Sequence, residues 1–267
     1  MASVAKVEQP VNGVYEQEPL TSLAEPVDRY PYGYRVAQET QPDETVGYSY
    51  IPLTQADFLD PQEGDRLTQS DPHIKFVFSL VSRFLKHYLG VTDVGVFSDL
   101  KMLWRIPGLK EPAPDLAIVP NLVDQHKYRG SFDVVAEGTR PCLVVEVMSP
   151  QYPGDDTIKV DIYRQAQIPE YIIINPHFED EENHFELIGY RLVGKRYQRM
   201  KPDAQGRLLS ETTGVWFGLD ESGRDLILTN ARTVERLLTD EEEYEARLAA
   251  EAEVARLKAL LEKRNGH

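Results

Sequence analysis

Cysteine is almost absent from this 267-residue sequence, and so are long apolar runs. The single thiol, Cys142, excludes an intramolecular disulfide and a zinc site built from several cysteines. It stands just before an apolar run, so we expect a buried structural thiol. A transmembrane helix needs about 20 mostly apolar residues, and no such stretch occurs. The first residues also lack the apolar segment of a secretory signal, and together these features predict a cytoplasmic protein without a membrane anchor.

Basic residues are in short supply. There are 29 Lys and Arg against 44 Asp and Glu, which gives a net charge of −15. Proteins that coat DNA without specificity depend on clustered positive charge, so this composition disfavours that class. It remains compatible with an enzyme that has a local basic groove, or with a site that holds cations. Part of the acidity lies between Asp240 and Glu253, in a pattern typical of a solvated helix face.

Several well-known catalytic motifs are missing. The chain has no glycine-rich phosphate loop, no HExxH and no G-x-S-x-G. Its six histidines show no metal-ligand spacing. A pair of carboxylates could serve a glycosidase, but the aromatic residues expected of a sugar-binding cleft are not found around the acids considered below. The sequence therefore disfavours nucleotide-binding P-loop proteins, zinc peptidases, serine hydrolases and glycosidases.

Apolar periodicity divides the chain into three parts. Residues 1–50 are rich in Pro, Glu and Gln, which predicts a flexible N-terminal arm, with a short strand where Tyr30, Tyr32 and Tyr34 alternate. Residues 51–232 have the pattern of one domain. Residues 233–267 are helical, with apolar residues at coiled-coil spacing, so we expect either a homodimer through this helix or a helix folded back on its own domain. The spaced residues are Ala250, Val254, Leu257 and Leu261.

Helices and strands alternate within the predicted domain. A helix begins at Asp71-Pro72, an N-cap followed by proline, and ends at Gly90. The apolar runs 115–119 and 143–148 predict buried strands. Further strands are expected at 94–97, 101–106 and 171–174, with a helix between Gly154 and Pro169 and hairpins around Gly194 and Gly223.

Two carboxylates stand where charge is unexpected. Glu146 lies inside the apolar run 143–148, and Asp115 opens the other buried strand directly after Pro114. A charge inside a buried strand needs a partner or a metal. If the two strands pair, both acids meet at one end of the sheet, and such oxygen ligands suit Mg²⁺ or Mn²⁺. Taken singly, Asp115 could cap its strand and Glu146 could pair with an arginine.

The helix after residue 154 adds a lysine and a tyrosine. Asp156, Lys159 and Tyr163 are spaced i, i+3 and i+7 and share one face, beside the apolar face of Ile158 and Ile162. A lysine near two carboxylates and a metal can orient a water and balance charge in a phosphoryl-transfer transition state. The alternative is an exposed Asp156–Lys159 pair on a surface helix, which would contribute little to stability.

Together these motifs resemble the PD-(D/E)XK nuclease superfamily and, within it, the branch of restriction endonuclease-like proteins. The resemblance covers about residues 50–200. Its motifs are Pro114-Asp115, the strand with Glu146 followed by Ser149-Pro150, and the series Asp155, Lys159, Tyr163, Ile168-Pro169-Glu170-Tyr171 and Asn175-Pro176.

The resemblance implies a fold and an activity. The fold would be α/β, a restriction-endonuclease-like mixed β-sheet flanked by helices, here with a C-terminal helix added. The activity would be metal-dependent hydrolysis of DNA phosphodiester bonds by an endonuclease that uses Mg²⁺ or Mn²⁺. Asp115, Glu146 and the backbone carbonyl of Val147 would bind the metal. Lys159 would help to activate water, and Tyr163 would position Lys159 or a phosphate.

Two positions depart from the family pattern. The family's lysine usually follows the second acid by two residues, where this chain has Met148, so the resemblance requires that the lysine has moved to the helix as Lys159. The family's early helical acid would be Glu63 or Asp65, in a segment that otherwise resembles a surface turn. Met148 and the net charge favour an alternative, a catalytically inactive nuclease-fold protein for binding or assembly.

Overall fold

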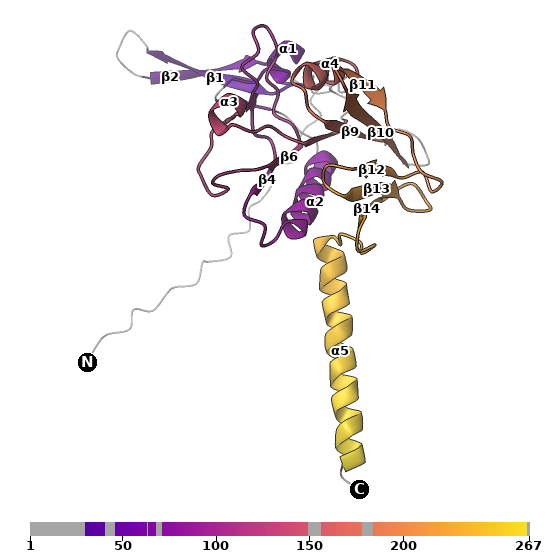
Figure 1. Ribbon diagram of the computed structural model, residues 1–267. Helices are drawn as coiled ribbons and strands as arrows, with labels where there is room; N and C mark the ends of the chain where they lie inside the picture. The colour runs from indigo at the N-terminus through magenta and orange to yellow at the C-terminus, as the bar shows by residue number, and fades with distance from the viewer. Residues whose placement is uncertain are drawn as a thin grey trace, which may run out of the picture.

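A six-stranded mixed β-sheet forms the centre of the computed structural model (Figure 1), which describes residues 30–40, 46–62, 64–67, 71–148, 156–177 and 184–265. The strand order is β11-β10-β9-β8-β6-β4, and only the β8–β9 pair in this sheet is parallel. The predicted mixed sheet is confirmed. Its strands are β4 (Val94–Phe97), β6 (Leu116–Pro120), β8 (Leu143–Val147), β9 (Glu170–His177), β10 (His184–Val193) and β11 (Arg196–Arg199).

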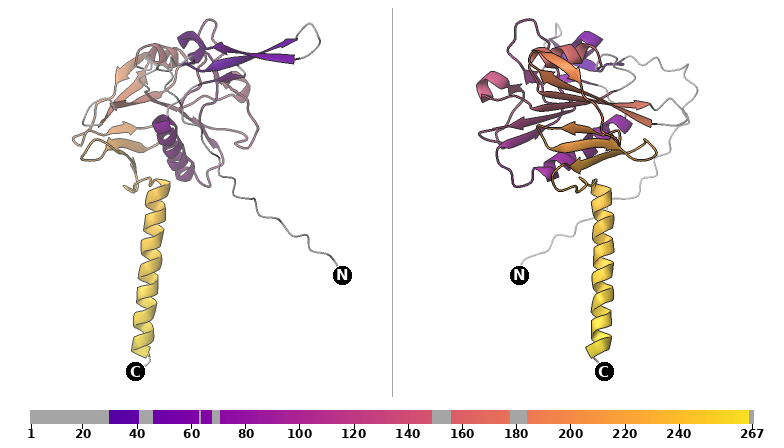
Figure 2. Two further views of the ribbon diagram at one scale, coloured as in Figure 1. Left: turned by 180° about the vertical axis from the view of Figure 1, so that it is seen from behind. Right: turned by 45° about the vertical axis from the view of Figure 1, so that its right-hand side comes forward.

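Both faces of this sheet are covered (Figures 1 and 2). On one face lie α2 (Asp71–His87) and a small antiparallel sheet. On the other lie α4 (Ile158–Gln165) and the short parallel strands β5 (Met102–Leu103) and β7 (Phe132–Asp133). The small sheet consists of β12 (Leu208–Ser210), β13 (Val215–Leu219) and β14 (Leu226–Asn230). Two one-turn helices, α1 (Gln55–Phe58) and α3 (Val134–Glu137), lie in the connections.

The central strand β8 shows why both layers are needed. Successive side chains of a strand point to opposite faces. Leu143, Val145 and Val147 pack in the cluster with α2, whereas Val144 packs in the cluster with α4. Both sets are buried, so the strand is apolar at consecutive positions, and Glu146 falls on the same face as Val144. This alternation directs the one charged side chain of β8 toward α4.

A hairpin precedes the central sheet. β1 (Tyr34–Thr40) and β2 (Val46–Pro52) pair antiparallel, and β3 (Asp65–Arg66) joins the other edge of β1. Figure 1 shows the hairpin projecting from the body. The prediction of a loose arm up to residue 50 is therefore wrong over these strands, while residues 1–29 lie outside the described residues. Val46, Tyr48 and Tyr50 alternate with Gly47 and Ser49 along β2, but the two tyrosines are exposed, so the strand adds little to the core.

The C-terminal helix α5 (Asp240–Asn265) extends away from the body (Figures 1 and 2). Thr239 and Glu242 form a reciprocal cap at its start, where Asp240 also accepts hydrogen bonds from Ser82 and Lys86 of α2. The predicted helix is confirmed, but the alternative in which it folds back on its own domain is wrong. Within the described residues, no helix has the length and apolar character needed to cross a bilayer.

Glu170 links the two sheets. This buried carboxylate at the start of β9 accepts hydrogen bonds from the Arg191 guanidinium of β10 and from the hydroxyls of Ser210 and Thr212, at 2.6 Å for each hydroxyl. A buried charge that loses its counterion is costly. The Arg191–Glu170 pair therefore holds β12 and the following turn against the central sheet.

Replacing Arg191 with Met should destabilise the fold by about 2–3 kcal/mol. The loss is smaller than the roughly 3–5 kcal/mol of a fully buried pair, because 32% of the Arg191 side chain is exposed. Urea unfolding followed by circular dichroism measures it. The control is Arg199→Met, which removes a 3.9 Å surface pair with Glu186 and should leave the midpoint unchanged. Equal midpoints for both variants would contradict the role given to Arg191.

Candidate functional site

Asp115 and Glu146 lie at one end of the central sheet, where β6 begins and β8 ends. The antiparallel register pairs Leu116 with Val145, which sets the residue before β6 beside the last residues of β8. The Val147 N–H donates a 2.7 Å hydrogen bond to Asp115 Oδ2. Both acids are buried, and Glu146 is only 2% exposed. The structure thus brings together the two acids that the sequence singled out.

α4 supplies the two groups that contact Glu146. Lys159 Nζ lies 3.0 Å from Glu146 Oε2, and the Tyr163 hydroxyl donates a 2.5 Å hydrogen bond to Oε1. Lys159 is 4% exposed and Tyr163 is fully buried. The alternative of an exposed Asp156–Lys159 surface pair is therefore wrong. Each oxygen of the buried Glu146 carboxylate has a donor from the same helix.

The buried face of α4 differs from the predicted one. Ile158 was expected to face the core, but it is 41% exposed, and Lys159, Ile162 and Tyr163 point inward instead. The buried carboxylate of Glu146 explains why α4 is rotated about its axis relative to the prediction, because a charge in an apolar layer must be compensated. An isoleucine at the end of a short helix loses less by exposure than Glu146 would lose without its cation.

Aromatic rings hold the lysine and the tyrosine in place. The Tyr163 ring packs edge-on against Trp104, at 6.1 Å between centroids, and against Tyr171, at 4.8 Å. The Phe58 ring of α1 lies 5.5 Å from Lys159 Nζ, a distance suited to a cation–π contact. Such packing restricts the positions of the Lys159 ammonium and the Tyr163 hydroxyl, as a preorganised site requires.

His73 is a site residue that the sequence did not reveal. It lies in the first turn of α2, and its Nε2 is 3.2 Å from Asp115 Oδ1. The six histidines have no shared spacing, so no motif pointed to it. A weaker signal was present, because His73 precedes Val77 by four residues and Leu80 by seven, and so lies on the buried face of the helix.

The remaining candidate positions lie elsewhere or outside the description. Asp65 is bound to Arg35 at 2.6 Å, and these hydrogen bonds hold the pKa of Asp65 below its ordinary value, so its role is to join β1 and β3. Glu63, Ser149, Pro150 and Asp155 lie outside the described residues. Met148 is half-buried and packs in the cluster on the α4 face.

The donor chemistry of this site fits a divalent cation. Magnesium binds oxygen ligands, needs only one or two carboxylates and keeps several waters. Asp115 and Glu146 offer carboxylates, and Val147 offers a backbone carbonyl. Among the described residues, no group of three or more His, Cys, Asp or Glu side chains is placed to hold a metal ion. Water would therefore have to complete the coordination of a cation bound by these groups.

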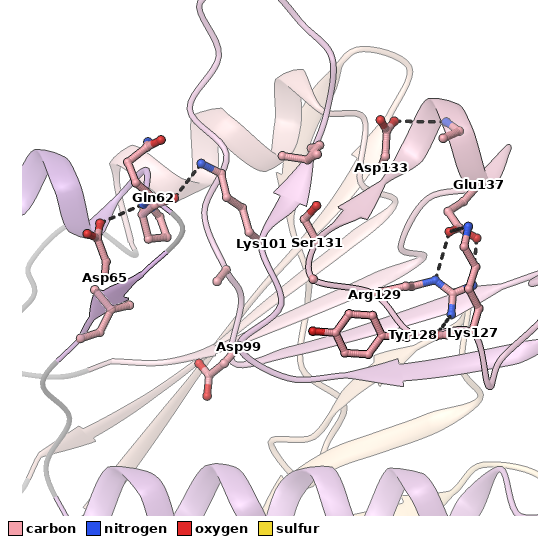
Figure 3. A pocket seen from close by; sticks show the side chains of 16 residues that line it. Gln62, Asp65, Asp99, Lys101, Lys127, Tyr128, Arg129, Ser131, Asp133 and Glu137 are labelled. Atoms are coloured by element: carbon pink, nitrogen blue, oxygen red, sulfur yellow. Dashed lines mark hydrogen bonds and ion pairs between the residues drawn. The ribbon is translucent and has the colours of Figure 1, made fainter. Parts of the chain in front are cut away.

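A cavity of about 640 Å³ is lined in part by Ala113, two residues before Asp115 in the sequence, and Figure 3 shows the side chains that line it. Three basic and four acidic side chains line it. Lys127 and Arg129 both bind Glu137. Their hydrogen bonds lower the pKa of the Glu137 carboxyl to about 2, and the bond from Arg129 has the larger effect. Lys101 binds Asp60 at 2.9 Å. The cavity therefore has no excess of positive charge for a polyanion.

The chain matches a known family over the whole central sheet. A family model described as "Putative restriction endonuclease" (Uma2) matches residues 67–222. The chain belongs to the Uma2 family. The matched range contains His73, Asp115, Glu146, Lys159 and Tyr163, so the whole site lies inside the Uma2 region, while α5 and the whole β1–β2 hairpin lie outside it. The restriction endonuclease-like identification made from the sequence is confirmed.

One solved structure shows similarity to this Uma2 chain. It is described as a "putative nuclease belonging to DUF820" from Anabaena variabilis ATCC 29413. The similarity has a TM-score of 0.39 at 14% sequence identity and covers 66% of this chain and 83% of that one. No curated protein matches this chain.

Lys159→Met should destabilise the fold by about 3–5 kcal/mol, the usual cost of breaking a buried ion pair from one side. Adding Glu146→Gln should restore most of the loss, because the neutral amide no longer needs the ammonium. The free energies of unfolding are measured by urea titration with a chelator present, so that no cation replaces the lysine. If the double variant is as unstable as Lys159→Met, the 3.0 Å contact is not what holds α4.

Proposed function

We propose that this protein is a metal-dependent endonuclease that hydrolyses DNA phosphodiester bonds with Mg²⁺ or Mn²⁺ as cofactor. The observation that carries the proposal is the end of the central sheet, where two buried carboxylates meet and one of them is bound by a lysine and a tyrosine. Membership of the Uma2 family supports it. The cytoplasm, which holds both DNA and Mg²⁺, is the proposed location.

Each site residue has a distinct task in this proposal. Asp115, Glu146 and the Val147 carbonyl would hold the cation, which when bound polarises a phosphoryl oxygen and makes a water more acidic. The Val147 N–H fixes the orientation of Asp115. The Tyr163 hydroxyl fixes that of Glu146. Lys159 brings the positive charge that balances negative charge developing on the phosphate oxygens.

Asp115→Asn should abolish cleavage without changing the fold. The wild type should nick supercoiled plasmid with Mg²⁺ or Mn²⁺, and the variant should be slower by roughly 10²-fold or more, as when a preorganised charge is removed. The matched control is Asp156→Asn, an exposed acid just before α4, which should cleave like the wild type. Calorimetry should show Mn²⁺ binding that Glu146→Gln abolishes. Undiminished binding in that variant would refute the metal assignment.

The role of Lys159 can be tested by placing a lysine at position 148 instead. Lys159→Met should slow cleavage by roughly 10²–10³-fold if the ammonium acts electrostatically in the transition state. Adding Met148→Lys restores a lysine at the family's usual strand position, and partial recovery would place both positions at one catalytic point. The assays are run at a temperature where circular dichroism shows both variants folded. Cleavage by Lys159→Met at the wild-type rate would remove Lys159 from the mechanism.

A catalytically inactive binding or assembly protein is the second candidate function. Two observations favour it, namely Met148 at the usual lysine position and the excess of acid in the cavity that Ala113 lines. This candidate predicts that Mn²⁺ binds and that no DNA is cleaved under any divalent metal. The plasmid assay therefore separates the two functions, since binding alone does not.

The proposed partner in assembly is a second copy of this chain, bound through α5. The helix is fixed at its start, and its apolar seam is exposed, with Leu257 at 47% and Leu261 at 49%. Val254 and Leu257 take the a and d positions that favour two-stranded parallel coiled coils. In that register Glu253 at g faces Lys258 at e of the other helix, which is an attractive charge pair.

Leu257→Glu combined with Leu261→Glu should convert the dimer to a monomer, because two charges would enter the seam of each helix. Static light scattering measures the mass. The matched control is Ala252→Glu with Ala259→Glu, which adds the same charge at the outer f positions and should remain dimeric. A chain that ends at Thr239 should also be monomeric. If the wild type has the mass of one chain, the helix does not mediate self-association.

A further inference from the structure

His73 lies within reach of any cation that Asp115 holds. Its Nε2 is 3.2 Å from Asp115 Oδ1, while the other oxygen, Oδ2, accepts the hydrogen bond from the Val147 N–H. The imidazole is buried, and it comes from α2, on the opposite side of the sheet from α4. Thus Asp115 Oδ2 contacts the backbone of β8, and Asp115 Oδ1 faces the Nε2 atom of His73.

The separation of these two atoms suits neighbouring ligands of one ion. Donors that lie about 2.1 Å from an octahedral cation and at a right angle to each other are about 3 Å apart. The observed 3.2 Å is close to that value. Glu146 is drawn toward Lys159 and Tyr163, so His73 and Asp115 are the two side chains already at ligand spacing.

We propose that His73 is a ligand of the divalent site and makes it a mixed nitrogen–oxygen site that favours later first-row ions over Mg²⁺. This inference rests on the metal site of the proposed function. Carboxylates and water suit Mg²⁺ and Mn²⁺, whereas imidazole suits ions such as Co²⁺, Ni²⁺ and Zn²⁺. Asp65, one of the two acids that the resemblance offered, is bound by Arg35, and Glu63 lies outside the described residues. The first turn of α2 supplies an imidazole to the site.

A simple hydrogen bond is the competing explanation. In that case the Nε2 proton is donated to Asp115, and His73 only positions the carboxylate. Removing a positioning group changes the affinity for every cation by about the same factor, because all of them use the same carboxylate. Removing a nitrogen ligand changes the affinity for Co²⁺ far more than that for Mg²⁺. The ratio of the two affinities therefore separates the two roles.

The test is calorimetric titration of full-length wild type, His73→Asn and His126→Asn with CoCl₂ and with MgCl₂. Asparagine keeps a polar side chain at this position but is too short to place its amide where Nε2 of His73 lies, so the nitrogen ligand is removed. We expect His73→Asn to weaken Co²⁺ binding by roughly tenfold or more and Mg²⁺ binding much less, so that the ratio falls. His126 is exposed on a loop, so His126→Asn should bind both metals like the wild type.

A second measurement keeps the inference testable if His73→Asn folds poorly. In the wild type, bound Co²⁺ should give the ring N–H of His73 a large contact shift, which requires a direct metal–nitrogen bond, and should give His126 none. An unchanged Co²⁺/Mg²⁺ ratio, or a His73 resonance without a contact shift when Co²⁺ is bound, would overturn the ligand role while leaving the proposed nuclease intact. Failure of the wild type to bind either metal would overturn the metal site and this inference together.

Discussion

The buried carboxylate of Glu146 constrains the structure around it. A carboxylate in the middle of an apolar layer needs a cation and hydrogen-bond donors, and α4 provides them as Lys159 and Tyr163. To do so the helix turns Ile158 outward. The rings of Trp104 and Tyr171 then fix Tyr163, and Phe58 covers the ammonium. The packing on this face of the sheet thus follows from one charge in β8.

The site lies at one end of the central sheet, where both covering layers contribute groups. Alternate side chains of β8 point to opposite faces of the sheet. Along the strand, α2 and α4 therefore pack on opposite sides of it. Beyond the last residue of the strand, both layers can contribute to one point. His73 from α2 contacts Asp115, and Lys159 from α4 contacts Glu146. A strand end in a covered sheet therefore collects groups that are 42 and 13 residues apart in the sequence.

The sequence predicted the elements of the site better than their orientation. The strands around Asp115 and Glu146 could be recognised because both are continuous apolar runs, and a charge in such a run is conspicuous. The face of α4 was misjudged, because the apolar period favoured Ile158 and the pairing energy of a buried charge is a tertiary effect. His73 was missed for the same reason, since only folding brings it to Asp115. Strand β2 has exposed tyrosines and adds little to the core, and it was predicted as part of a loose arm.

The charge balance of the site supports the proposed cation. Two buried carboxylates, Asp115 and Glu146, are accompanied by one buried ammonium, Lys159, so among these three groups negative charge exceeds positive charge by one. An excess charge in a poorly solvated place is costly, and a bound cation relieves it. A lysine on the strand at position 148 would point to the same face as Glu146 and would neutralise it without any helix. Because Lys159 is on α4, the position of its ammonium depends on how that helix packs against the sheet. Loss of α4 packing would then remove Lys159 and Tyr163 together, so the proposed catalysis and the stability of this layer depend on the same contact.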